Sequence, residues 1–571
     1  MTRRPEELDY AVDETPPPLK LLALGLQHAV LVSVYLVLVV VVVRAAKAPE
    51  AVVLSMLSFA MLALAAAAVL QALPRGPVGS GYLAVPVYSA IYLGPSVLAA
   101  EAGGLPAVFG MTIFAGAVEV VLSRFLRPLR GLFPPAVSGF IVCIVGIELG
   151  LVGVSQALAV EAYEAGALNY AAHLAAAAVT LCVGIGLSVW ATGFLRLVCS
   201  LAALVAGVAV AVAGGLVSPQ HWAALAGSPW LALPDPGFLA YSFEPAVLPA
   251  FLAAAIAATL RTIGVVTTCQ KLNDSDWKRP DMRTLKGGAL ADGLGCMVAG
   301  LAGAPGLNAA PSLVGVSSAA RATSRSIAYA CAAILVVAAL TPKVGAFFLA
   351  LPLSVAGGLL VFSASLMIAG GIGIMVSRTI DIRATFVIGL SLLLALGTKV
   401  YPTYFADLPQ AVHTFTGGVL ATGVFASVLL TLLFRIGIRR RASLRLADGS
   451  ASLEEFLRIL GERGRAWKIA PDVLSRATES AAEAVRELRA AGILEQTLAA
   501  SISYDDVDLT VELAYEGSVL RTPERHLRRR NLVEEESFAY GLANFLTAVH
   551  PDRVSTRSDG RTAILRMDFS A

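Results

Sequence analysis

PGLNAAPSLVGVSSAARATSR, the stretch from Pro305 to Arg325, lies between two long apolar segments and is crowded with Gly, Pro, Ser, Asn and Arg. A helix that faces lipid does not tolerate this mixture, because unpaired backbone groups and charges persist at membrane depth only where they face protein or a cavity. A helix that is broken at mid-membrane exposes amide N–H groups to a solute. We therefore expect a broken crossing here, and a solute-binding site within it.

The composition places most of the chain in a bilayer. Of its 571 residues, 57% are hydrophobic and only 15% are charged, which predicts a polytopic membrane protein and excludes a soluble one. The net charge of +3 does not indicate nucleic-acid binding. The 6 cysteines occur singly, as small core residues do, and predict neither a disulfide framework nor a metal site.

Apolar windows near the length of a membrane-crossing helix follow one another along the chain. They are Leu19–Ala45, Ala51–Leu73, Gly104–Leu122, Phe133–Val152, Tyr170–Trp190, Phe194–Val217, Pro245–Cys269, Leu285–Gly303, Ile327–Leu340, Phe347–Ile368, Arg383–Gly397 and Thr416–Phe434. Gly79–Ser96 and the opening stretch are apolar enough to enter the membrane but too interrupted for a plain helix. Counting both gives about fourteen segments, with a broken third and a broken tenth. The sequence therefore predicts an all-α polytopic membrane fold of two inverted seven-segment repeats.

The loop charges predict the orientation, since Lys and Arg concentrate on the cytoplasmic side. With the N-terminus inside, the loops expected in the cytoplasm hold Arg124, Arg127, Arg130, Lys271, Lys278, Arg279, Arg283, Lys286, Arg378, Arg435, Arg439, Arg440 and Arg441. The loops expected outside, Gly153–Asn169 and Ser218–Glu244, hold no Lys or Arg. Residues 1–18 are then a cytoplasmic tail, residues 19–441 form the transmembrane domain, and both termini lie in the cytoplasm.

After Arg441 the composition becomes that of an ordinary soluble domain. Helical periodicity appears in Ser452–Lys468, in Asp472–Ala490 and around Ser537–Val549, and strand-like alternation appears at Val507–Ala514 and Thr562–Phe569. Residues 442–571 are therefore expected to form a cytoplasmic α+β domain of the usual size. Ser452–Lys468 also fits a plain linker helix.

Five motifs of the transmembrane part stand in a characteristic order and spacing. They are GLQH (Gly25–His28), LFPPAVSG (Leu132–Gly139), ADGLG (Ala291–Gly295), SLVGVSSAARATSR (Ser312–Arg325) and LPLSVAGGLL (Leu351–Leu360). Together they resemble the nucleobase/ascorbate transporter family, also called nucleobase-cation symporters. The resemblance implies a fourteen-segment fold split into a core and a gate domain, usually dimeric. It also implies that the substrate lies between the third and tenth segments and moves by an elevator-like shift of the core.

The family's tenth-segment signature resembles Gln/Glu-Asn-x-Gly-x-x-x-x-Thr-Lys/Arg/Gly. It falls here on Ser312, Leu313, Gly315, Ala320 and Arg321. The glycine and the basic residue are kept, whereas the three other positions have lost the family's residues, so base readout at Ser312 and Leu313 departs from the family. The positions that the resemblance places beside the substrate in the two broken crossings are Tyr88, Ser89, Ala90, Ser312, Leu313, Val314 and Gly315. Tyr88 either stacks on a planar solute or packs as an ordinary core aromatic.

The eighth segment departs further from the family, which places a carboxylate four residues before a second polar residue, around an Ile-Gly. The matching run here is RTIGV (Arg261–Val265). A carboxylate accepts hydrogen bonds, whereas a guanidinium only donates them. An arginine beside the positive ends of two half-helices would form an anion site, so we expect Arg261 to bind an anionic solute. The alternative is an ion pair of Arg261 with Glu119 or Glu148, since burying an unpaired arginine costs at least about 2.5 kcal/mol.

The remaining candidate residues each have a functional and a structural interpretation. His28 is a candidate proton relay, or a buried histidine that a carbonyl satisfies. Glu119 and Glu148 are candidate coupling carboxylates, or scaffold partners for Arg321 and for the arginine of the eighth segment. Asp292 is expected to cap the ninth helix.

The C-terminal part resembles the histidine-kinase-like ATPase fold of anti-sigma-factor kinases. ATESAAEAVREL (Ala477–Leu488) stands where that family has its Glu-x-x-x-Asn helix, and AYEGSVL (Ala514–Leu520) where it has Asp-x-Gly. Phe538–Phe569 is similar to its closing helix and hairpin. Glu483 replaces the asparagine that would hold Mg²⁺, and Tyr515 replaces the aspartate that would read adenine. We therefore expect a degenerate regulatory or dimerisation module without ATP use.

These observations predict a secondary active transporter of a small, anionic solute in the cell inner membrane, working as a homodimer without cofactor or bond chemistry. The family resemblance favours a nucleobase such as xanthine, urate or uracil. A small inorganic or carboxylate anion such as bicarbonate is the alternative within the same class. A solute-sensing receptor that signals through the C-terminal domain is the alternative from another class. H⁺ and Na⁺ both remain open as the coupling ion.

Overall fold

The structure is a computed structural model of the chain, and it describes two compact units. The described residues are 4–570 without 127–133, 165–168, 193, 198, 218–224, 278–279, 377–379, 409–411, 413–415, 417, 435–439, 447–449, 468, 470, 491–497, 506–507, 517–550, 552 and 560–561. The first unit ends at Thr431 and the second begins at Leu432. The basic residues Arg127, Arg130, Lys278, Arg279, Arg378, Arg435 and Arg439 and the predicted helix Ser537–Val549 lie outside the described residues.

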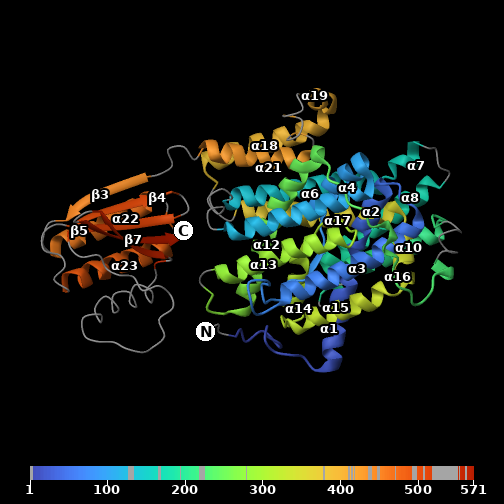
Figure 1. Ribbon diagram of the computed structural model, residues 1–571, viewed down its shortest axis with the longest axis horizontal. Coiled ribbons are helices and arrows are strands. Elements are labelled where there is room, and N and C mark those ends of the chain that lie inside the picture. The colour runs from blue at the N-terminus through green and yellow to red at the C-terminus, as the bar shows by residue number, and fades with distance from the viewer. Residues whose placement is uncertain are drawn as a thin grey trace. The chain divides into compact units, whose positions relative to one another are not determined.

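The first unit is built from long apolar helices that run side by side (Figure 1). In the described part, eight helices are long and apolar enough to cross a membrane, or nine if a bent pair counts as one span. They are α1 with α2 (Pro18–Val34, Leu36–Ala45), α3 (Glu50–Ala72), α4 (Ala90–Arg124), α6 (Pro135–Ala157), α8 (Tyr170–Trp190), α12 (Leu248–Asn273), α17 (Leu353–Met375), α18 (Ile382–Val400) and the bent pair α15 and α16 (Ser326–Ala339, Pro342–Leu349). The other helices are α7 (Val160–Glu164), α9 (Phe194–Leu197), α10 (Cys199–Ala213), α13 (Met282–Leu301), α14 (Pro311–Ala319), α19 (Pro402–Ala406) and α21 (Val419–Phe434). The chain is thus a mostly helical polytopic membrane protein, and the count of fourteen crossings stays a prediction.

The crossing predicted at Phe347–Ile368 corresponds to α17, but its predicted start was too early. Helix α16 ends at Leu349 and α17 begins at Leu353. Proline lacks an N–H and disfavours helix in the residue before it, so Pro342 and Pro352 separate α15, α16 and α17. Helix α16 is bent by 82° from α15 at a break that lies before Phe347, and the predicted window is divided where α16 ends and α17 begins.

Two further windows are also divided or extended. The window Leu19–Ala45 is interrupted at Tyr35, between α1 and α2. The window that was predicted to begin at Gly104 continues from Ala90, with a kink between two helical parts of α4. Gly104 has a φ of 69° in that kink, a conformation that glycine adopts without the steric cost other residues meet.

The two interrupted stretches meet through a short antiparallel pair of strands. Strand β1 (Pro86–Tyr88) pairs with β2 (Leu307–Ala309), Pro86 lying opposite Ala309. The Ser89 N–H donates to the Gly306 carbonyl at 3.1 Å and extends the ladder. Helix α4 begins directly after β1, and α14 begins directly after β2. Each half of the unit thus contributes a strand followed by a helix start, as the two interrupted stretches predict.

Close approaches at glycines define two bundles within this unit. Helices α4 and α13 pack together, and a Cβ on Gly116 would lie 2.6 Å from the Gly293 carbonyl oxygen. Helices α6 and α17 pack in the same way, and a Cβ on Gly139 would lie 2.4 Å from the Met375 nitrogen. Helices α3 and α12 pack with the first pair, and α8 and α10 with the second. We name them the α4–α13 bundle and the α6–α17 bundle.

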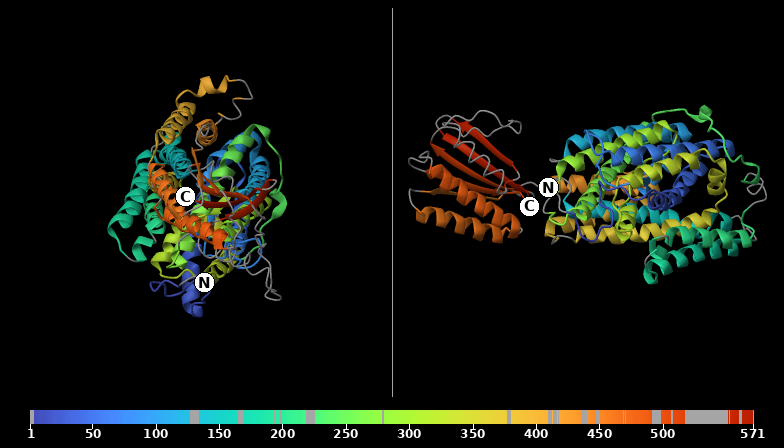
Figure 2. Two further views of the ribbon diagram at one scale, coloured as in Figure 1. Left: turned by 90° about the vertical axis from the view of Figure 1, so that its left-hand side faces the viewer. Right: turned by 90° about the horizontal axis from the view of Figure 1, so that it is seen from below.

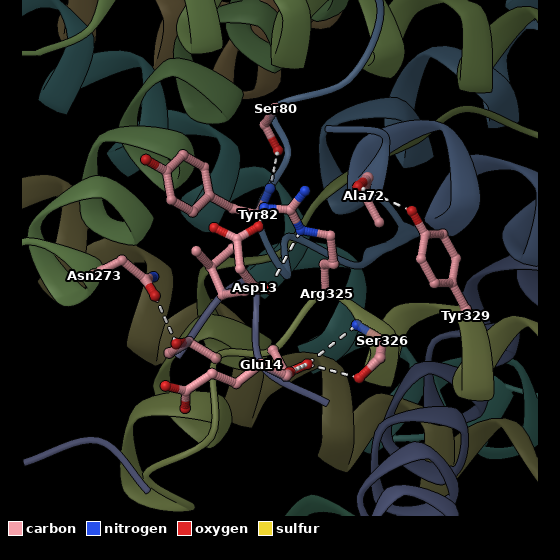
Figure 3. A network of polar contacts seen from close by, with 12 residues as sticks. Asp13, Glu14, Ala72, Ser80, Tyr82, Asn273, Arg325, Ser326 and Tyr329 are labelled. Carbon is pink, nitrogen blue, oxygen red and sulfur yellow. Dashed lines mark hydrogen bonds and ion pairs between the residues drawn. The ribbon is translucent and has the colours of Figure 1, made fainter. Parts of the chain in front are cut away.

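Residues 4–14 form an extended segment, the N-terminal strap, that lies against the loop after α14 (Figure 3). The Thr323 N–H donates to a strap carbonyl at 2.9 Å, and the Thr323 hydroxyl donates to the Asn273 side chain at 2.7 Å. Arg325 forms an ion pair with Asp13 of the strap. The strap therefore joins the first residues of the chain to the ends of α12 and α14.

The second unit is a five-stranded antiparallel sheet with two helices on one face (Figure 2). The strands are β3 (Arg440–Leu446), β4 (Leu498–Tyr504), β5 (Asp508–Glu516), β6 (Arg553–Asp559) and β7 (Thr562–Ser570), and their order in the sheet is β3-β4-β5-β7-β6. The helices are α22 (Ser450–Ala466) and α23 (Pro471–Ala490). Phe456 and Leu460 of α22 are fully buried in the core of this unit, so the linker interpretation of α22 is wrong.

The predicted strands at Val507–Ala514 and Thr562–Phe569 correspond to β5 and β7, and β6 pairs with β7 in the hairpin that the family resemblance implies, whereas β3 and β4 were not predicted. Strand β3 begins at Arg440, so the sheet starts two residues before the predicted domain boundary. Glu483 pairs with Arg486 at 3.2 Å, and Tyr515 is buried in the core. Both positions thus make contacts inside this unit.

Candidate solute-binding site

The start of α14 offers backbone amides that no side chain caps. The N-cap position is Ala310, whose methyl group cannot accept a hydrogen bond, and Pro311 follows at the first helical position. The N–H groups of a helix's first turn have no partners within the helix, and they attract anions. Ser312 and Gly315 are exposed, whereas the side chains of Leu313 and Val314 are buried. Leu313 and Val314 can therefore reach a solute here only through their backbone.

The start of α4 is capped by a serine side chain, which also contacts Arg261. Ser89 is its N-cap and accepts a hydrogen bond from the Ile91 N–H at 3.2 Å. The guanidinium of Arg261, on α12, donates to the Ser89 hydroxyl oxygen at 3.4 Å. Ala90, the first residue of α4, is partly buried. The eighth-segment arginine thus contacts the third-segment candidate Ser89.

Tyr88 points away from this site. Its hydroxyl donates to the Ala60 carbonyl on α3 at 2.7 Å, and its side chain is fully buried. The ring has no exposed face for a planar solute in this structure. Packing, the second of its two interpretations, describes what Tyr88 does here.

Two glycines, one on α12 and one on α14, each have open space beside them. No described atom lies within 4 Å of the positions that a Cβ would take on Gly264 or Gly315. Gly264 stands on the same face of α12 as Arg261 and Thr268, and Gly264 and Thr268 are both exposed. Polar groups at membrane depth face protein or a cavity. We therefore place the candidate site in this space.

Tyr35 is a further residue of the site that the sequence did not single out. It lies at the break between α1 and α2, and its hydroxyl is 3.3 Å from the Ser312 hydroxyl. It also lies within electrostatic reach of Arg261. A tyrosine that interrupts the run VSVYLVLVV (Val32–Val40) was the available signal, since this is the only aromatic ring in an otherwise aliphatic stretch.

Asp292 does not cap the ninth helix, and that prediction was wrong. It lies in the interior of α13, fully buried. Its carboxylate accepts hydrogen bonds from the Thr262 hydroxyl at 2.8 Å, from the Asn308 amide at 2.5 Å and from the Ala309 N–H at 3.0 Å. The amide of Gln71 approaches it at 3.5 Å. Asp292 therefore fastens β2 to α12 and α13, directly behind the candidate site.

The predicted ion pairs of the buried acids are not formed among the described residues. Glu119 accepts a hydrogen bond from the Tyr92 hydroxyl and contacts Asp292. Glu148, on α6, accepts one from the backbone of Leu420 at the start of α21. Neither is within ion-pair distance of Arg261. Glu148 also lies so close to α4 that a Cβ on Gly94 would stand 2.4 Å from its carboxylate oxygen.

Arg321 and His28 both have local partners. Arg321 lies at the exposed end of α14 and pairs with Asp9 of the N-terminal strap at 3.6 Å, so neither glutamate is its partner. His28 is buried, with Nδ1 at 2.9 Å from the Leu24 carbonyl and Nε2 at 3.1 Å from the Ser317 hydroxyl. His28 is thus satisfied by a carbonyl and a hydroxyl, and it joins α1 to α14.

Comparisons with known proteins give a family for the transmembrane part. The model of the Permease family matches residues 19–404. The chain is 28% identical over 371 residues to the putative purine permease CPE0397 of Clostridium perfringens, an alignment that covers 65% of this chain and 80% of the relative. It is 27% identical over 386 residues to the xanthine permease XanP of Escherichia coli, covering 64% and 81%. Among solved structures, SLC26A9 aligns with a TM-score of 0.47 at 13% identity, covering 75% of this chain and 67% of the other.

Proposed function

The chain belongs to this Permease family and is a membrane transporter, not an enzyme, and we propose that it is a secondary active transporter of the inner membrane with both termini in the cytoplasm. The solute binds in the space between Arg261, Ser312 and Gly315. It is moved without any covalent step. The second unit, from Leu432, regulates transport or dimerisation.

The proposed solute is an oxidised purine bound as its anion. Arg261 and the first-turn amides of α14 only donate hydrogen bonds, so they match a solute edge that only accepts them. A purine whose acidic ring N–H has ionised presents such an edge, together with its carbonyl oxygens. The names of the two relatives, a purine permease and a xanthine permease, favour this class. The single observation that carries the proposal is the Arg261 guanidinium at the capped start of α4, with no acid paired to it among the described residues.

The proposed movement is an elevator-type shift of one bundle against the other. Both broken crossings and Arg261 belong to the α4–α13 bundle, so the whole site travels as one body. The α6–α17 bundle would stay fixed in a homodimer. Contacts between the bundles are then made and broken in each cycle, and the close approach of Glu148 to Gly94 is one such contact.

Uptake of labelled xanthine, uracil and bicarbonate into vesicles tests the proposal, with wild type compared to Arg261→Ala and Arg261→Lys. A hydrogen bond from a charged group contributes about 1.5–3 kcal/mol, so Arg261→Ala should lower xanthine uptake by roughly 10- to 100-fold. Arg261→Lys keeps the positive charge but loses the planar guanidinium with its paired donors. Its xanthine uptake should lie between that of wild type and that of Arg261→Ala. Ser365→Ala, an exposed change on α17 of the other bundle, is the control and should transport normally.

Other outcomes would redirect the proposal. Uracil uptake that is equal in wild type and Arg261→Ala would remove the anion preference. Bicarbonate uptake without xanthine uptake would support the small-anion alternative. If the full-length chain binds solute but does not transport it, the result would support the receptor alternative. In that alternative the second unit signals that solute has bound.

A further inference from the structure

The carboxyl group of Glu119 is buried between α4 and α13 and is only half satisfied by donors. Its Oε1 accepts a hydrogen bond from the Tyr92 hydroxyl. Its Oε2 has no hydrogen-bond donor among the described residues, yet the carboxyl group lies in hydrogen-bonding contact with that of Asp292. Two acceptor groups do not attract each other, so this contact requires a proton on one of them.

The donors around the pair indicate which carboxyl group holds that proton. Asp292 accepts from Thr262, Asn308 and the Ala309 N–H, and the Gln71 amide lies at 3.5 Å. That set satisfies a charged carboxylate. Glu119 has one donor, and a proton on its Oε2 would give that atom the partner it lacks, by donation to Asp292. Repulsion between two neighbouring carboxylates makes a second negative charge costly, so loss of the Glu119 proton depends on the other charges nearby; no cation is within ion-pair distance of either group among the described residues.

We propose that Glu119 Oε2 is the site that binds and releases the proton moved with each solute. This inference rests on the proposed function and adds its coupling ion. The titratable groups that face the pair are Tyr92 from α4 itself and Cys296 from α13, while Arg261 on α12 lies within electrostatic reach of Asp292. The proton binds to an oxygen of the Glu119 carboxylate and leaves as a proton, so no other reactant is needed.

The position of Asp292 explains why proton and anion binding would be coupled. Arg261 is the positive charge that acts on Asp292, and a bound anion neutralises that charge. The remaining negative charge of the carboxyl pair then favours a proton on Glu119. By linkage, a proton on Glu119 strengthens anion binding by the same factor. Both ligands therefore bind together and leave together, which is the requirement for symport.

The test compares Glu119→Gln with wild type in three measurements on xanthine: binding across pH, exchange between labelled and unlabelled solute, and uptake driven by an inward proton gradient. Glutamine keeps the shape and can donate to Asp292 as the protonated acid does, but it cannot release a proton. Wild-type Kd should rise with pH, by up to about tenfold per pH unit for one linked proton. Ionisation of the solute changes Kd with pH equally in both proteins. The additional pH dependence that comes from Glu119 should therefore be absent in Glu119→Gln. Exchange should persist, and gradient-driven accumulation should be lost.

Glu164→Gln, an exposed acid on α7, is the comparison and should keep proton-driven accumulation. The proposal is overturned if Glu119→Gln still accumulates xanthine under a proton gradient, since the shared proton would then be purely structural. It is also overturned if Glu148→Gln alone loses accumulation. Failure of the transport proposal has a different signature, because wild type would then neither bind nor exchange xanthine.

Discussion

The two broken crossings have the same strand-and-helix arrangement, but they differ in whether a side chain accepts hydrogen bonds from the first N–H groups of the helix. Each has a strand of three residues that pairs with the other, and each strand leads directly into a helix. At the start of α4, Ser89 caps the helix and the next residues are buried. At the start of α14, Ala310 cannot cap, Pro311 has no N–H to give, and Ser312 is exposed. The first start is capped by a side chain, whereas the second has no side-chain cap.

This difference teaches that two halves of one unit can share a strand-and-helix arrangement while their helix starts differ in exposure and capping. At the start of α4, the Ser89 hydroxyl accepts a hydrogen bond from Arg261 of α12, so a positively charged side chain lies there. The start of α14 supplies bare amides beside open space. A solute that needs both kinds of donor must bind between them.

The largest expected effect comes from Gly306→Ala, which breaks the strand pair common to both crossings. A Cβ on Gly306 would lie 2.3 Å from the ring of Tyr92, which is fully buried and holds Glu119. Overpacking of this kind costs about 1–3 kcal/mol, so the thermal unfolding midpoint of the purified protein should fall clearly. A Gly306→Ala protein as stable as wild type would contradict the close packing described here.

A smaller effect is expected for Gly315→Ala, which sharpens the comparison by filling space only at the second start. No described atom lies near the added methyl group, so stability should be unchanged. The methyl group narrows the space for solute, and xanthine Kd should rise by about tenfold, or 1.4 kcal/mol. Gly264→Ala, on the facing helix, is the matched variant. If both bind xanthine as wild type does, the space beside these glycines is not the solute site.

The smallest effect is expected from exchanging the caps, with Ser89→Ala at the first start and Ala310→Ser at the second. Loss of a serine N-cap costs about 1 kcal/mol of stability, and Ser89→Ala also removes a partner of Arg261. Ala310→Ser adds an acceptor for a first-turn amide of α14, so it should stabilise the protein and weaken xanthine binding a few-fold. Thermal unfolding and binding measured on the same samples check both. A gain in affinity on Ala310→Ser would reverse the roles assigned to the two starts.

The helices and the broken crossings could be predicted because their physical signals are local. Twenty apolar residues indicate a crossing wherever they stand, and a cluster of Gly, Pro and Ser within such a stretch indicates a break. The helix breaks at Pro342 and Pro352 were missed because hydropathy does not indicate the direction in which a helix runs. A bend of 82° between α15 and α16 leaves the apolar run unchanged.

The candidate site was predictable only in part, because its remaining members depend on tertiary contacts. Arg261, Ser89 and Ser312 could be named from motif positions. Tyr35 could not, since its role depends on where α1 breaks relative to α14. Asp292 was assigned as a cap from its place near a helix start, and only the packing of β2 against α13 reveals its hydrogen bonds to Asn308 and Thr262.

The N-terminal strap has a consequence for how the chain is made. Its hydrogen bonds to Thr323 and Arg325 join residues that a ribosome produces more than half a chain apart. During synthesis the strap must therefore wait, without its partner, until the second repeat has been inserted. Protection of the first fourteen residues from a protease would thus report when the two repeats of a nascent chain have come together.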